Sequence, residues 1–246
     1  MREWRLIIDL PRGGHENMAI DEAIFYACQD GLSPSTVRFY GWIQPTLSLG
    51  FSQKVVGLYV SRCQDLGIPV VRRITGGGAV LHDKELTYSI ICKRDEPLFR
   101  EGILGAYRII SGCFVSALKG IGVKAESRVK SRESRVEKNE YSCFHTPSRF
   151  EVVVEGKKLI GSAQKRSSNA FLQHGSILFD VDVDKFNRVF EEGPASGVTW
   201  IYNYNREIEL DWFRRIIVRE IERGLGIRLR RGELTPIEVL RKEERE

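Results

Sequence analysis

The chain has 246 residues, of which 42% are hydrophobic and 29% charged, enough apolar material for the core of one large domain. The net charge is only +5 and the basic residues are scattered among acidic ones, which argues against nucleic-acid binding. No apolar run approaches the roughly 20 residues of a membrane helix, and the N-terminus lacks a signal-peptide pattern. We therefore expect a cytoplasmic protein that binds neither nucleic acid nor membrane.

The five cysteines show neither a disulfide pattern nor a zinc pattern, because their number is odd and no C-x-x-C occurs. Cys28, Cys92 and Cys113 fall in helical or strand-like runs and are predicted to be small core residues. Cys63 falls in a predicted helix. We therefore predict no disulfide framework and no metal site.

Hydrophobic periodicity, with turn residues between the periodic segments, predicts strands and helices along the whole chain. The predicted strands are residues 1–9, 36–42, 46–51, 69–74, 86–93, 149–154, 158–164 and 170–180. The predicted helices are residues 17–30, 55–66, 102–119, 183–191 and 211–224. Residues 124–140 are charged and lack apolar periodicity, so we expect an exposed loop there.

The order of these elements indicates the fold class. The triple glycine at 76–78 lies between two predicted strands instead of opening a helix, which argues against a dinucleotide-binding Rossmann fold. The irregular alternation favours an α+β fold with a mixed, largely antiparallel sheet flanked by helices. We expect residues 1–246 to form a single domain with a short helical C-terminal extension at about 205–246, where Thr235 and Glu238 predict a capping box.

Cys143 lies in the polar, turn-forming run Tyr-Ser-Cys-Phe-His-Thr-Pro-Ser, unlike a structural cysteine in an apolar run. A thiol in such a place is a candidate acyl acceptor, because even a few per cent of thiolate at neutral pH is very nucleophilic. The alternative interpretation is a free loop cysteine without function. The surrounding motifs favour the acyl acceptor.

Lys158 opens a predicted strand that continues as Leu-Ile-Gly-Ser-Ala-Gln. A solvated lysine on an edge strand is the ordinary interpretation of such a position. If the side chain instead enters a pocket, its charge can hold an acyl carbonyl or stabilise a thiolate. Gly161 supports the close approach of a ligand to this strand.

A motif rich in glycine begins at Arg72 and reads Arg-Arg-Ile-Thr-Gly-Gly-Gly-Ala-Val-Leu-His-Asp. Its three glycines let the backbone approach a ligand and present N–H groups to phosphate or carbonyl oxygens. Arg72 and Arg73 are candidates to hold an anion, and His82 is a candidate to orient the loop. His174, in the run Gln-His-Gly-Ser, either faces the same pocket or is a hydrogen-bonded histidine of the sheet.

Together these motifs resemble the superfamily of lipoate–protein ligases, biotin–protein ligases and octanoyltransferases. Besides the glycine motif, the lysine strand and the run at 173–176, the matching segments are Met-Ala-Ile-Asp-Glu-Ala at 18–23, Arg-Phe-Tyr-Gly-Trp at 38–42 and Leu-Ser-Leu-Gly-Phe-Ser-Gln at 47–53. Within this superfamily, Ser-Cys-Phe around Cys143, followed by Pro-Ser and Glu151, is similar to the LipM-type octanoyltransferases.

The resemblance implies the catalytic-domain fold of biotin and lipoate protein ligases. It implies transfer of octanoyl from acyl carrier protein to a lysine of a lipoyl domain, such as the glycine-cleavage H protein, without ATP, metal or other cofactor. Cys143 is then the nucleophile that carries the acyl group, and Lys158 assists it in the acyl pocket. The implied substrate-binding residues are Arg73, Thr75, Gly76, Gly77, Gly78, His82, Gly161, Ser162, Ala163 and His174.

Three alternatives stay open at this point. An ATP-dependent lipoate ligase would bind a lipoyl-adenylate near the glycine motif, whose Gly-Gly-Gly-Ala-Val form is common in ligases. A LipL-type amidotransferase would use a cysteine to move octanoyl between two lipoyl domains. A non-enzymatic acyl-binding protein would use the same pocket and form no covalent adduct.

Overall fold

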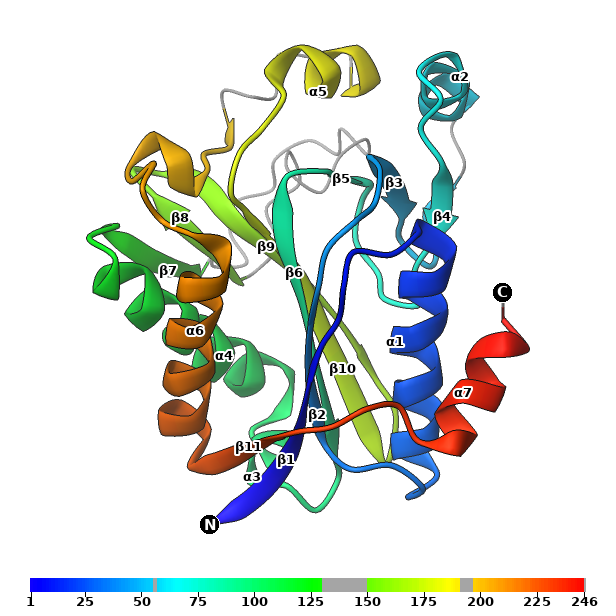
Figure 1. Cartoon of the computed structure of the whole chain (residues 1–246), viewed down its shortest axis with the longest axis vertical. Coiled ribbons are helices and arrows are strands. Elements are labelled where there is room, and N and C mark those ends of the chain that lie inside the picture. Colours follow the sequence, from blue (N-terminus) through cyan, green and yellow to red (C-terminus); the bar gives the residue numbers. More distant parts are fainter. Residues whose placement is uncertain (55–56, 130–149, 191–196, 246) are drawn as a thin grey trace.

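A computed structural model of the chain describes residues 1–54, 57–129, 150–190 and 197–245. Its centre is an eight-stranded sheet with helices on both faces (Figure 1). From one edge to the other, the strands are β11 (Ile227–Arg231), β1 (Arg2–Ile8), β2 (Thr36–Tyr40), β6 (Glu85–Lys93), β10 (Ala170–Leu178), β9 (Lys157–Arg166), β8 (Phe150–Val154) and β7 (Ala125–Val129).

A second, three-stranded sheet lies near one end of the large sheet (Figure 1). It contains, in order, β4 (Val70–Arg72), β3 (Thr46–Leu49) and β5 (Val80–His82). The helices are α1 (Gly14–Gln29), α2 (Gly57–Asp65), α3 (Pro97–Arg100), α4 (Gly102–Gly120), α5 (Val183–Phe190), α6 (Leu210–Leu225) and α7 (Pro236–Glu243), with a short 3₁₀ helix η2 (Ile201–Asn203).

The strand pairing confirms the predicted mixed, largely antiparallel sheet. β1 pairs in parallel with β11 and β2, whereas the other neighbouring strands of the large sheet are antiparallel. β8, β9 and β10 form the predicted meander. Glu155 and Gly156, the two residues of the first turn, both have positive φ (51° and 78°), the backbone that suits a two-residue hairpin turn.

The central strands are buried on both faces, which explains their nearly continuous apolar sequences. On β6, Ile90 and Cys92 face the core that contains α4 and α6, while Ile91 between them faces α1. This alternation follows from the two-residue period of a strand. Cys28, Cys92 and Cys113 are buried, as predicted for core residues, and Cys63 is buried as well. Cys143 lies outside the described residues.

Two sequence expectations need correction. Ala125–Val129, expected to be part of an exposed loop, forms the edge strand β7 and pairs with β8. The sequence conceals this strand because Glu126 and Arg128 point to solvent, leaving no apolar run. The rest of the expected loop, residues 130–140, lies outside the described residues. Ile227–Arg231, expected to lie in the helical C-terminal extension, likewise forms the edge strand β11, in which exposed arginines leave no apolar run. β5, which has three residues and begins one residue after the triple glycine, was not predicted either.

Among the described helices, only α4 is long and apolar enough, by length and composition alone, to cross a membrane. Such a segment was not expected from the sequence. The apolar side chains of Ile110, Phe114 and Leu118 on this helix are buried in the main core cluster. α4 packs against α6 and against β7 and β8, so its apolar face has a partner inside the protein.

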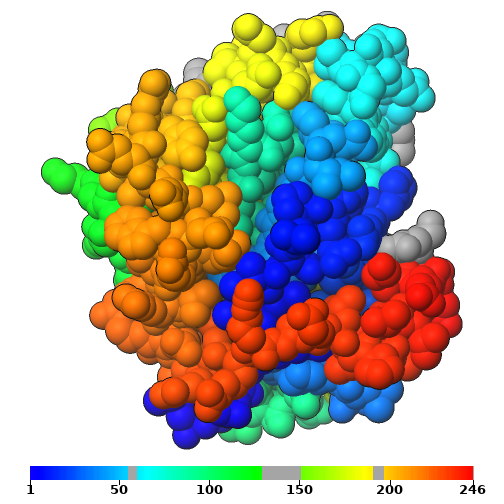
Figure 2. All heavy atoms as spheres, viewed as in Figure 1, coloured from blue at the N-terminus to red at the C-terminus, as the bar shows by residue number. Residues whose placement is uncertain are grey.

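The C-terminal residues return to the N-terminal part of the chain. β11 pairs with β1, and α7 packs on α1, so the orange and red segments of Figure 2 cross the blue ones. The predicted capping box at Thr235 and Glu238 is present. Glu238 is fully buried and accepts hydrogen bonds from Arg5 Nη1 (2.7 Å) and Nη2 (2.5 Å) and from Ser33. The N-terminal strand is thereby tied to the last helix.

We predict that Glu238→Gln lowers the free energy of unfolding at pH 7 by about 3 kcal/mol, because it leaves the buried Arg5 guanidinium without its counter-ion. Urea unfolding measures this loss. Burial alone raises the pKa of Glu238, but hydrogen bonds from Arg5 and Ser33 outweigh it and hold the pKa below its ordinary 4.5. The ionised carboxylate therefore stabilises the fold above pH 4.5, and this contribution disappears as the pH falls through the lowered pKa.

The difference in the free energy of unfolding between the wild type and Glu238→Gln should accordingly shrink as the pH falls below 4.5. Glu243→Gln, at an exposed position of the same helix, is the matched control and should unfold like the wild type. An equal effect of both substitutions would contradict a specific role for the buried pair.

Candidate active site

A pocket lies where the two sheets meet, and α1 contributes to its wall. The residues of the sequence prediction that line it are Arg73, His82, Lys158, Gly161, Ser162, Ala163 and His174. Thr75 and the triple glycine do not line the pocket. They are hydrogen-bonded to two residues that do, since Thr75 contacts His174 and Gly76 accepts from Arg73. Cys143 lies outside the described residues. The structure therefore brings together most of the predicted binding residues around Lys158.

Lys158 is 4% exposed, so it is not the solvated edge lysine of the ordinary interpretation. It stands at the start of β9, an inner strand, two residues after the tight turn at Glu155 and Gly156. Its Nζ donates to Glu151 Oε1 on β8 at 2.8 Å. An ammonium group in this partly enclosed pocket interacts more strongly with nearby charge than it would in water.

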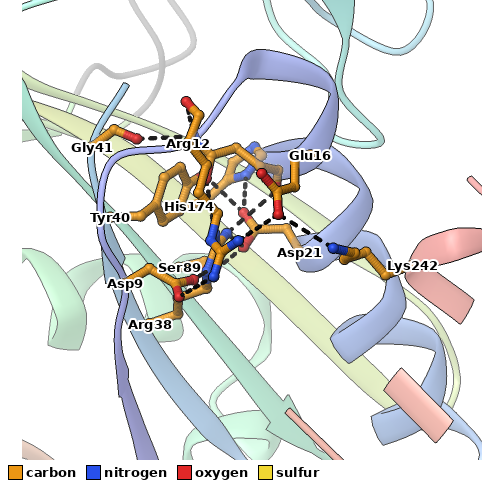
Figure 3. A network of polar contacts seen from close by, with 11 residues as sticks. Asp9, Arg12, Glu16, Asp21, Arg38, Tyr40, Gly41, Ser89, His174 and Lys242 are labelled. Carbon is orange, nitrogen blue, oxygen red and sulfur yellow. Dashed lines mark hydrogen bonds and ion pairs between the residues drawn. The ribbon is translucent and has the colours of Figure 1, made fainter. Parts of the chain in front are cut away.

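Behind the pocket, Asp21 on α1 is the centre of a buried polar network (Figure 3). Its carboxylate accepts hydrogen bonds from Arg38 Nη1 (2.8 Å), Tyr40 Oη (3.0 Å) and Ser89 Oγ (2.9 Å). His174 Nδ1 lies 3.2 Å from Asp21 Oδ2. Burial raises the pKa of Asp21, but the hydrogen bonds and charges of His174 and Arg38 lower it by more than burial raises it. The net pKa lies below the ordinary value of 3.8, so the carboxylate is ionised.

His174 connects this network to the glycine motif. Its Nε2 lies 2.6 Å from Thr75 Oγ1, directly before the three glycines. Burial lowers the pKa of His174 and outweighs the opposite effect of Asp21, while the charge of Arg73 lowers it further. The imidazole is therefore neutral at pH 7, and its two bonds fix the position of Thr75.

Arg73 shapes the glycine motif through hydrogen bonds to carbonyl groups. Its guanidinium donates to Gly76 O (2.9 Å), Gly78 O (2.7 Å) and both oxygens of Ser48 (3.0 Å each). Gly77 has a φ of 97°, which favours glycine. The sequence suggested that Arg73 holds an anion, whereas these bonds go to oxygens of the protein. The arginine thus gives the loop a defined shape.

The neighbouring residue Arg72 binds the loop after β3 in the same manner. Its Nη1 donates to the carbonyl oxygens of Gly50 (2.7 Å), Phe51 (3.1 Å) and Gln53 (2.9 Å). The two loops are in close contact, because a Cβ on Gly50 would lie 1.9 Å from Gly77 O. The consecutive arginines of the motif therefore hold two adjacent loops together.

His82 stands at the end of β5 with both ring nitrogens engaged. Its Nε2 lies 2.8 Å from Ser48 Oγ, and its Nδ1 lies 2.8 Å from Glu85 Oε1. The imidazole is stacked on Trp42, with ring centroids 4.0 Å apart and planes 12° apart. Thr87 also donates to Glu85. The ring is therefore fixed from three sides.

The strands β9 and β10 approach each other closely beside the pocket. A Cβ on Gly175 would lie 2.5 Å from Gly161 O and 2.8 Å from Ser162 Oγ, so this position requires glycine. Ser162 Oγ shares a 2.7 Å hydrogen bond with Tyr88 Oη. Gly161 was predicted to permit the close approach of a ligand. In these contacts it instead permits the close packing of β9 against β10 in the pocket wall.

Sequence reasoning missed the buried carboxylates Asp21 and Glu85 and the pocket residues Ser48 and Tyr40. A signal for Asp21 was present, since it lies among the apolar residues that α1 buries, where an unpaired charge is costly. Glu85 likewise opens a strand that is almost wholly buried. The partners of Asp21, and Ser176 as a partner of Glu85, are far away in the sequence, so only the folded chain reveals them.

The fold and the site together define the class of this protein. The model of the lipoyl protein ligase A/B catalytic domain family matches residues 14–222, and the chain belongs to that family. The LipM octanoyltransferase of Brevibacillus brevis is 45% identical over 191 residues, covering 75% of this chain and 68% of the relative. The LipM octanoyltransferase of Clostridioides difficile is 37% identical over 253 residues, covering 97% of this chain and 93% of the relative.

Solved structures show the same fold. A lipoate-protein ligase A bound with ATP superposes with a TM-score of 0.83 at 24% identity, over 98% of this chain and 93% of the ligase. A bipartite lipoate protein ligase from Thermoplasma acidophilum gives a TM-score of 0.79 at 23% identity, over 99% and 92%. The expected architecture of biotin and lipoate protein ligases is thereby confirmed.

We predict that Gly50→Ala destabilises the fold by about 3 kcal/mol, because the added methyl group must displace the backbone of Gly77. Thermal and urea unfolding measure this loss. Gly112→Ala is the control, since a Cβ at that position of α4 meets no atom within 4 Å. That variant should be about 0.5–1 kcal/mol more stable than the wild type. Equal stability of the Gly50 variant and the wild type would disprove the close contact of the loops.

Proposed function

We propose that this chain, an octanoyltransferase of lipoate biosynthesis, carries the octanoyl group as a thioester on Cys143. It takes the group from acyl carrier protein and delivers it to a lysine of a lipoyl domain, such as the glycine-cleavage H protein. The LipM relatives support the reaction class. We also propose a cytoplasmic location, where the thiol that this chemistry requires stays reduced.

The buried Lys158 is the observation that carries this proposal. A cation enclosed in a pocket favours the thiolate form of a nearby cysteine and polarises a bound thioester carbonyl. Glu151 orients the ammonium group through their 2.8 Å contact. A pocket whose wall includes Met18, Val80 and Ala163 suits an acyl chain beside this charge.

In the first step, the Cys143 thiolate attacks the carbonyl carbon of the octanoyl thioester on the carrier protein. A new C–S bond forms, the old one breaks, and the thiolate of the carrier's prosthetic arm leaves. One thioester replaces another, so the step is nearly neutral in free energy and depends on the position and ionisation of the thiol. The Lys158 ammonium group, which lines the pocket, is proposed to stabilise the oxyanion.

In the second step, the amine of the acceptor lysine attacks the acyl-enzyme. A C–N bond forms and the C–S bond to Cys143 breaks, which releases the octanoylated lipoyl domain. An amide is more stable than a thioester, so this step is downhill and makes the overall transfer favourable. Neither step consumes ATP.

We predict that incubation with octanoyl-acyl carrier protein, without ATP, yields a hydroxylamine-labile octanoyl adduct on the wild-type enzyme. Cys143→Ala should yield no adduct, because it lacks the acyl acceptor, and should fold normally. Intact-mass spectrometry measures both results. Modification of a lipoyl domain only in the presence of lipoate and ATP would instead identify a ligase. An adduct formed only from an octanoylated lipoyl domain would identify LipL-type transfer.

We predict that Lys158→Met raises the pH at which Cys143 becomes reactive, because the thiolate loses its stabilising charge. Iodoacetamide labelling of Cys143 as a function of pH measures the shift, and formation of the octanoyl adduct should fall at least about 100-fold. Lys165→Met, on the same strand but outside the pocket lining, is the control. Unchanged labelling in the Lys158 variant would show that the ammonium does not act on the thiol.

A further inference from the structure

Three side chains at the pocket form a continuous chain of hydrogen bonds from a hydroxyl to a carboxylate. Ser48 Oγ lies 2.8 Å from His82 Nε2, and His82 Nδ1 lies 2.8 Å from Glu85 Oε1. Ser48 and His82 line the same pocket as Lys158, while Glu85 lies behind them at the start of β6. The order of hydroxyl, imidazole and carboxylate is the one that moves protons in many hydrolases.

The partners determine the direction of each hydrogen bond. Burial raises the pKa of Glu85, but the charge of His82 and bonds from His82 and Ser176 lower it, so Glu85 is ionised and accepts from His82 Nδ1–H. In the neutral form of the ring, Nε2 is then an acceptor for the Ser48 hydroxyl. Arg73 donates to Ser48 Oγ at 3.0 Å, which fills one lone pair of this oxygen.

The proposed second step requires a proton acceptor in the pocket. As the C–N bond forms, the attacking nitrogen becomes acidic and must lose a proton before the amide is complete. In the proposed first step Lys158 acts as an ammonium group beside Glu151, and an ammonium group has no site for a further proton. His174 is a poor acceptor, because burial and the charge of Arg73 disfavour its imidazolium form.

We propose that Ser48, His82 and Glu85 form a proton relay for attack by the acceptor lysine; this inference rests on the proposed function. The ammonium group of that lysine first loses one proton to water. As the neutral amine attacks and the C–N bond forms, its next proton passes to Ser48 Oγ, and Ser48 gives its own proton to His82 Nε2.

The C–S bond then breaks and Cys143 leaves as a thiolate. The imidazolium opposite the Glu85 carboxylate later releases its proton to water, which restores the relay. His82 and Ser48 thereby act on the reacting amine, and Glu85 is a positioning residue that also stabilises the imidazolium. Three other charged or titratable groups act on this relay: Arg73 donates to Ser48, His174 interacts electrostatically with His82, and Tyr40 interacts with Glu85.

A single-turnover experiment separates the two steps. The enzyme is loaded with octanoyl-acyl carrier protein, the adduct is quantified by intact mass, and an apo lipoyl domain is added to discharge it. We predict that His82→Ala loads octanoyl but discharges it at least about 100-fold more slowly than the wild type. Imidazole in the buffer should restore discharge, whereas pyrazole, a ring of the same shape but a far weaker base, should not.

Ser48→Ala supplies a second test, because it removes only the hydroxyl and should also slow discharge after normal loading. His15→Ala and Ser61→Ala, at exposed positions, are the matched controls and should behave like the wild type. Discharge within about threefold of wild type in both relay variants, equal rescue by pyrazole, or an octanoyl adduct on Ser48 would overturn the relay. Failure of the wild type to load at Cys143 would instead overturn the proposed function.

Discussion

The structure depends on the pairing of two buried charges, Asp21 and Arg38. Neither side chain is accessible to water, so either charge alone would be costly, and together they also require the hydrogen bonds around them. Arg38 spans the gap between Asp9 (2.7 Å), Asn17 and Asp21, which fixes α1 against β1 and β2. Because His174 is bonded to the same carboxylate, the packing of α1 also sets the position of the pocket.

The two histidines of the site, His82 and His174, have similar surroundings, but we assign them different roles. Each lies between a buried carboxylate and a hydroxyl group. For His174 the cost of burial exceeds the benefit of its carboxylate, so the ring is a neutral support for Thr75. His82 has a closer carboxylate, at 2.8 Å compared with 3.2 Å for His174. One fold therefore uses the same arrangement once for architecture and once, we infer, for chemistry.

Periodicity predicted most of the fold because core strands and amphipathic helices depend on local sequence. It failed at the edge strands β7 and β11, whose exposed charges hide them, and at β5 and α3, which are too short to show a period. The motifs predicted which segments meet at the pocket. They could not predict the partners of Asp21, because a hydrogen bond between residues such as Asp21 and His174 spans most of the chain.

The parallel pairing of β1 with β11 has a consequence for biosynthesis. Arg2 pairs with Ile227, so β1 meets this neighbour only after the ribosome has added all the residues that separate the two strands. At a usual elongation rate, that interval is on the order of 10 to 45 seconds. During this time β1 can pair with β2, but its other edge has no partner and is open to association with another chain.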